Sequence, residues 1–131
     1  MTLILTPLQK ALLSLEEVLQ VPKTAIVRDS AIQRFEYTFE LSVKMLKRYL
    51  EMSEVSEAMV DELAYRDLIR LGSEKGCLTD TNAWFTYREA RNITSHAYDE
   101  KKAEQIYALL GAFALDARLL LTELERRADS V

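Results

Sequence analysis

Cysteine, histidine, proline and glycine are all scarce in this chain of 131 residues, and each shortage excludes a class of structure. The single cysteine, Cys77, cannot form an internal disulfide, which favours a reducing cytoplasm. One cysteine and one histidine, His96, are too few for a Cys/His metal site. With three glycines and two prolines, the chain has no glycine-rich phosphate loop and few helix breakers. We therefore expect neither a metal nor a cofactor.

Long apolar runs and excess positive charge are also missing. No stretch of about 18 consecutive apolar residues occurs, so we expect no membrane span. The first residues, Met1 to Leu5, are too short and lack the basic start of a signal peptide. The net charge of −4 gives no general attraction for nucleic acid, so such binding needs a local basic patch. These absences predict a cytoplasmic protein that does not bind membranes.

Strong helix formers dominate what is present, and the length suits one domain over residues 1–131. Apolar side chains recur every three or four residues in successive segments, which is typical of helices with one buried face. The expected helices cover residues 5–19, 26–52, 58–75, 80–93 and 99–127. We predict an all-α, up-and-down four-helix bundle with an extra short first helix on its side or end. The apolar faces are wide enough to leave surface for a second copy of the chain.

The stretch from Trp84 to Tyr98, WFTYREARNITSHAY, differs from the rest of the chain. It contains the only tryptophan and the only histidine, together with two arginines and three further aromatic residues. These side chains can bind anions, transfer protons and stack on bases. They are Trp84, Phe85, Tyr87, Arg88, Arg91, His96 and Tyr98.

Arg91 and His96 form the pair in this stretch with the most chemical potential. Arginine offers a permanent planar cation for a phosphate, and histidine exchanges protons near neutral pH. Together they could cleave RNA without a metal: a base takes the proton of the 2′-hydroxyl, which attacks phosphorus while a cation stabilises the oxygens. On an unbroken helix the two side chains would point about 140° apart. They converge only if the helix ends near Ile93–Ser95, or if a two-fold dimer supplies a second pair.

Two simpler alternatives remain open from the residues alone. Trp84 and Tyr87 share a helix side with Arg88 and Arg91, so they could stack on a nucleotide whose phosphate the arginines hold. Equally, the two rings could belong to the core, with the arginines in surface ion pairs and His96 a surface or capping group. In the first case the chain is a binding module without catalysis, and in the second it is a purely structural bundle.

The eight residues from Arg91 to Tyr98 resemble the signature of the HEPN superfamily: an arginine, four residues, a histidine, one residue and a tyrosine. More closely, the chain is similar to the nucleotidyltransferase substrate-binding proteins. Further support comes from Arg34–Glu40, from Trp84–Asn92 and from Tyr98–Glu100. The resemblance covers most of the chain, from about Leu8 to Leu124, and every signature position is present.

This resemblance implies a small helical bundle that forms a two-fold homodimer and assembles with a minimal nucleotidyltransferase encoded by an adjacent gene. Related pairs are toxin–antitoxin systems, in which the helical partner is a metal-independent ribonuclease and the nucleotidyltransferase silences it by adding AMP to the tyrosine. Carried over by position, Arg91 and His96 are catalytic, Asn92 is a supporting polar residue and Tyr98 is the modified residue. The alternative is a non-catalytic subunit that binds a nucleotide or the substrate of the partner enzyme.

Overall fold

The computed structural model describes residues 2–54 and 56–129, and in that part of the chain every regular element is a helix. The predicted all-α fold is therefore confirmed. The helices are α1 (Thr6–Leu19), α2 (Ala25–Ser53), α3 (Glu57–Asp61), α4 (Tyr65–Glu74), α5 (Thr81–Ile93), the 3-10 helix η1 (Thr94–His96), α6 (Glu100–Tyr107) and α7 (Leu110–Asp129).

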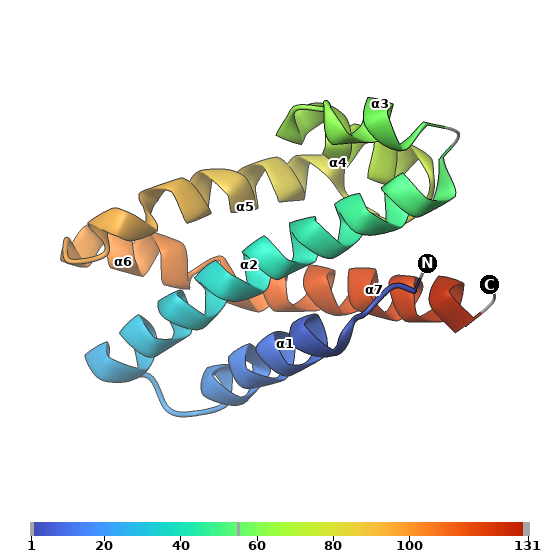
Figure 1. Ribbon diagram of the computed structural model, residues 1–131. Helices are drawn as coiled ribbons and strands as arrows, with labels where there is room; N and C mark the ends of the chain where they lie inside the picture. Colours follow the sequence, from blue (N-terminus) through green and yellow to red (C-terminus); the bar gives the residue numbers. More distant parts are fainter. Residues whose placement is uncertain (1, 55, 130–131) are drawn as a thin grey trace.

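The long helix α2 organises the bundle (Figure 1). It contacts α1, α5, α6 and α7 along its length, and α3 and α4 cover its C-terminal end. The first helix packs along α2 and α7. Helices α5 and α6 join at one end of the bundle, and the two chain termini lie toward the opposite end. The turn between α5 and α6, which holds the end of the signature, is thus presented at one tip of the molecule.

The expected helix over residues 58–75 is two helices, α3 and α4, separated by a bend. Val60 and Ile69 are both fully buried. They are nine positions apart, so on a straight helix their side chains would point about 180° away from each other. The bend at Ala64, whose backbone is extended, lets both side chains reach the core. The Ser56 hydroxyl caps α3 by accepting a hydrogen bond from the Met59 N–H, and Gly76, at φ 79°, follows the end of α4.

The expected last helix is likewise divided, into α6 and α7, by a short turn at Ala108 and Leu109. By length and composition alone, the stretch Glu100–Ala128 could cross a membrane. The core helix of a bundle meets the same criterion, and the inner face of this stretch is packed in the core. Its buried residues are Ala103, Ile106, Leu110, Phe113, Ala114, Ala117, Leu120, Leu121 and Leu124.

Phe113 of α7 lies at the centre of an aromatic cluster that joins three helices. Its ring centroid is 4.9 Å from that of Phe35 on α2, and 5.8 Å and 5.2 Å from those of Trp84 and Tyr87 on α5. All three pairs meet edge to face, the arrangement that the aromatic quadrupole favours. The cluster therefore fixes α5, and with it the start of the signature, against α2 and α7.

Candidate functional site

Helix α5 carries the candidate site, and local sequence determines where it begins. The Asp80 carboxylate accepts a hydrogen bond from the Ala83 N–H at 3.0 Å and so caps the first turn, within a run of residues that favour helix starts, Thr79–Asn82. Trp84, Tyr87 and Ala90 form its buried face. Arg88 lies on the exposed side, where it is free to meet a ligand.

The structure places Trp84 and Tyr87 in the core, with 2% and 3% of their surface exposed. Their spacing places them on the same side of the helix as Arg88 and Arg91. The two rings are nevertheless buried, whereas Arg88 is exposed and Arg91 is partly exposed. Tyr87 also donates a hydrogen bond to Asp116 Oδ2, and burial together with this bond raises its pKa. A nucleotide could stack on these rings only by opening the bundle, so we leave both residues out of the site.

The α-helix ends where the sequence predicts that it loosens, at Ile93, and η1 follows. The hydroxyl of buried Thr94 donates to the backbone carbonyl of Arg91 at 2.8 Å and accepts from Arg91 Nη1 at 3.1 Å. A threonine that bonds back to its own helix competes with continued α-helix. Thr94 directly follows the last residue of α5, and its hydroxyl oxygen also orients the Arg91 guanidinium.

Arg91 is held on its other side by α2. Its Nη2 donates to Glu40 Oε1, and the Arg91 side chain is 30% exposed against 59% for Glu40. Arg91 Nε is buried and has no partner in the described part of the chain. Two fixed contacts on one planar group leave little rotational freedom, so the guanidinium is pre-organised before any ligand arrives.

His96 is the last residue of η1, Tyr98 lies on the turn that follows, and both side chains are exposed. Tyr98 is 86% exposed, and its hydroxyl is 3.5 Å from His96 Nδ1. The two rings meet at 6.0 Å between centroids, with planes 63° apart. The imidazole is exposed and so accessible to a substrate, and its Nδ1 faces the tyrosine hydroxyl.

Arg91 lines an open hollow of about 480 Å³ between α2 and α5. Arg88 and Asn92 line the same hollow, as do two lysines of α2. The full lining is Phe39, Glu40, Val43, Lys44, Lys47, Arg88, Arg91 and Asn92. Within one chain, His96 does not line this hollow. The hollow therefore contains the arginine of the signature, Arg91, but not its proton-transfer group.

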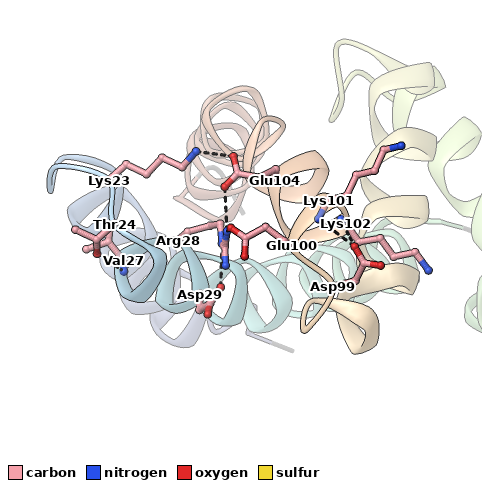
Figure 2. A network of polar contacts seen from close by, with 10 residues as sticks. All are labelled: Lys23, Thr24, Val27, Arg28, Asp29, Asp99, Glu100, Lys101, Lys102 and Glu104. Atoms are coloured by element: carbon pink, nitrogen blue, oxygen red, sulfur yellow. Dashed lines mark hydrogen bonds and ion pairs between the residues drawn. The ribbon is translucent and has the colours of Figure 1, made fainter.

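A network around Arg28 anchors the element that follows the turn (Figure 2). The Arg28 side chain is only 6% exposed, and its Nη1 donates to Glu100 at 2.7 Å and to Glu104 at 3.0 Å. Lys23 donates to the other carboxylate oxygen of Glu104, Oε2. Asp99 caps α6 by accepting bonds from the backbone N–H groups of its first turn. The N-terminal end of α2 thus holds α6, and so limits where the preceding turn can lie.

This network predicts an acid-sensitive step in stability. Hydrogen bonds from Lys23 and then Arg28 hold the pKa of Glu104 below its ordinary value of 4.5. A carboxyl whose pKa is lower in the folded state stabilises the fold above the unfolded pKa and loses that contribution as pH falls through the folded pKa. Thermal unfolding measured below about pH 4.5 should therefore show a falling Tm, with a shallower fall in Glu104→Gln. Identical slopes in the two proteins would contradict this role.

Sequence reasoning did not identify Glu40, Thr94 or Arg28 as parts of the site. Glu40 is 51 residues from Arg91, and Arg28 is 72 residues from Glu100. Thr94 lies inside the signature, and its hydroxyl at the expected helix end was a usable signal. In residues 2–54 and 56–129, no group of three or more His, Cys, Asp or Glu side chains is arranged to hold a metal ion.

Fold and site together define a helical bundle with an arginine–histidine signature at one end. The chain belongs to the family described as nucleotidyltransferase substrate binding protein like, which it matches over residues 3–126. It is 37% identical over 107 residues to the probable ribonuclease HepT of Haemophilus influenzae, covering 79% of this chain and 73% of that protein.

Solved structures give the same relationship. HI0074 of Haemophilus influenzae, described as the fold of a substrate binding domain of a nucleotidyltransferase, superposes with a TM-score of 0.88 at 32% identity. That match covers 93% of this chain and 99% of HI0074. A protein of Thermus thermophilus matches with a TM-score of 0.79 at 33% identity, covering 89% of this chain and 98% of that one.

Proposed function

We propose that this protein is the helical partner of a minimal nucleotidyltransferase and that it cleaves RNA without a metal, as a toxin that the partner neutralises. The observation that carries the proposal is the intact signature in its observed setting. Arg91 is fixed in a hollow, and His96 is exposed on the turn directly after the same helix. The similarity to a probable ribonuclease supports the same reaction class.

The reaction needs one base, one acid and one cation. His96 takes the proton of a ribose 2′-hydroxyl, and the oxygen attacks the adjacent phosphorus. The bond from phosphorus to the 5′-oxygen breaks, and that oxygen receives a proton, leaving a 2′,3′-cyclic phosphate and a 5′-hydroxyl. Glu40 and Thr94 occupy one donor on each terminal nitrogen of Arg91, so each keeps a second N–H for the phosphorane oxygens.

A two-fold homodimer would supply the second proton-transfer group. The chain has one histidine, whereas this reaction is served best by a base and an acid on opposite sides of the phosphate. A two-fold axis near the α5–α6 turn would place two copies of Arg91 and His96 in one cleft. Sedimentation should then give twice the mass of the chain.

Tyr98 would be the point of control. Its hydroxyl is accessible, and it lies beside His96 Nδ1 at 3.5 Å. AMP joined to that oxygen by the partner enzyme would place a bulky phosphodiester, with its negative charge, at the position where the substrate phosphate must lie. Modification there would block the site without unfolding the helix bundle.

The alternative is a non-catalytic subunit that binds a nucleotide or the partner's substrate. The hollow beside Arg91, with Arg88 and Asn92, favours it because these residues could hold a phosphate without any proton transfer. Calorimetric titration with ATP and with short RNA, with and without the partner, separates the two functions. Tight nucleotide binding with intact RNA would favour the subunit role.

The deciding experiment incubates purified protein with RNA in EDTA and analyses the product ends. We expect cleavage that EDTA does not stop, giving 2′,3′-cyclic phosphate and 5′-hydroxyl ends. Cleavage abolished by EDTA, or 5′-phosphate ends, would overturn the mechanism. RNA that stays intact at high protein concentration would overturn the proposed activity.

A further inference from the structure

Two arginines next to the candidate site are held by aromatic rings instead of carboxylates. The Arg66 guanidinium on α4 lies 4.4 Å from the ring centroid of Phe85, and that of Arg88 on α5 lies 4.6 Å from the ring centroid of Tyr65. Within residues 2–54 and 56–129, no ion pair joins Arg66 or Arg88 to an acidic side chain. Their charges are positioned by the rings, and in the described part of the chain neither guanidinium lies within ion-pair distance of a carboxylate.

This arrangement favours an anion as ligand. A guanidinium stacked on a ring is fixed in its plane, while the N–H groups at its edge stay available. Tyr65 is fixed in turn, since its hydroxyl donates to the Trp84 carbonyl at 2.8 Å, and burial raises its pKa. The phenol therefore stays protonated and keeps Arg88 in position over its ring.

The two arginines line a hollow of about 360 Å³ between α4 and α5. Its lining is Ala64, Tyr65, Arg66, Phe85, Arg88, Glu89 and Asn92. Arg88 and Asn92 also line the hollow that contains Arg91, so the two hollows are adjacent and share these two residues. Five basic side chains and two carboxylates line the pair of hollows, which gives a local positive surface on a chain of net charge −4.

We propose that the hollow of Arg66 and Arg88 is a subsite for a backbone phosphate of single-stranded RNA, beyond the phosphate that is cleaved; this rests on the proposed function. The adjacency of this hollow to the one that contains Arg91 favours a polymer over a mononucleotide, because a single phosphate would not use both hollows. The ring faces beneath the guanidiniums are already covered. The subsite therefore reads the backbone and is tolerant of base sequence.

Arg66→Gln tests the subsite, and Arg70→Gln on the next turn of α4 is the matched control. Arg70 also lies near the Phe85 ring, at 5.5 Å, but it is paired with Asp67 at 3.2 Å and does not line the hollow. In Arg66→Gln, the affinity for a fluorescent RNA long enough to cover both hollows should fall about 5- to 10-fold. The slope of log affinity against log salt should shrink by about 0.7, the value for one phosphate contact on a single strand.

Binding is measured by anisotropy in the His96→Ala background, so that the RNA stays intact, and cleavage is measured separately. The loss in kcat/KM caused by Arg66→Gln should be larger for the long RNA than for a dinucleotide. Equal RNA affinity in Arg66→Gln and Arg70→Gln would overturn the subsite even if the protein cleaves RNA. If Arg66→Gln weakens RNA binding but the unsubstituted protein does not cleave RNA, the proposed ribonuclease activity is overturned and the subsite is supported.

A third outcome would assign the surface to a different ligand. If Arg66→Gln weakens assembly with the nucleotidyltransferase and leaves RNA affinity and its salt slope unchanged, the arginines bind an acidic protein surface. That result would also overturn the RNA subsite.

Discussion

Replacing His96 by alanine should lower the rate of RNA cleavage by about 10²- to 10⁴-fold, the usual contribution of a positioned acid–base group. The side chain is exposed, and its one described polar contact is with Tyr98, so its removal should leave the fold intact. If a two-fold dimer uses one copy as base and the other as acid, the substitution removes both at once and the upper end of the range applies. Initial rates on a fluorogenic RNA in EDTA provide the measurement.

Ser95→Ala is the matched control for this prediction. Ser95 is the exposed neighbour of His96 on η1, so its substitution tests whether a change in that turn is itself harmful. Ser95→Ala should retain activity within about 2-fold, since exposed substitutions away from special contacts have small effects. Equal cleavage by His96→Ala and the unsubstituted protein would show that the activity comes from another residue or from a contaminating nuclease.

Local signals in the sequence were sufficient to locate most helix ends. Asp80 caps α5, which carries the start of the signature, and Asp99 caps α6, which follows the signature. Gly76 takes the left-handed conformation that is common after a helix. Each of these signals acts within a few residues of the chain. The end of α5 at Ile93 was also expected from local sequence, because β-branched and hydroxyl residues gather at Ile93–Ser95.

Contacts between distant segments had no such signal. The ion pair of Glu40 with Arg91 depends on how α2 lies against α5, and periodicity does not give that register. The bend between α3 and α4 lets Val60 and Ile69 both be buried. The need for a bend depends on how these helices pack on the rest of the bundle, and the sequence pattern alone does not give that packing. For the same reason the spacing of Trp84 and Arg88 showed a shared helix side without showing where core ends and surface begins.

Phe113→Ala should be the most destabilising of the simple substitutions in this chain, by about 3–5 kcal/mol. The ring is fully buried and touches the aromatic side chains of two other helices, so alanine would leave a cavity with stiff walls on α2 and α5. Because Trp84 and Tyr87 of α5 pack against this ring, local unfolding of α5 should become easier than that of the other helices. Thermal unfolding should show a Tm lowered by roughly 10 °C or more.

Leu115→Ala on the same helix supplies the comparison, since Leu115 is 71% exposed and its truncation opens no cavity. Its free energy of unfolding should change by about 0.5 kcal/mol or less. Hydrogen exchange of the α5 amides tests the link to the site: Phe113→Ala should speed exchange around Arg88 and Arg91 more than along α1. Uniform acceleration in every helix would mean that the aromatic cluster stabilises the fold as a whole and has no particular hold on the helix that carries the signature.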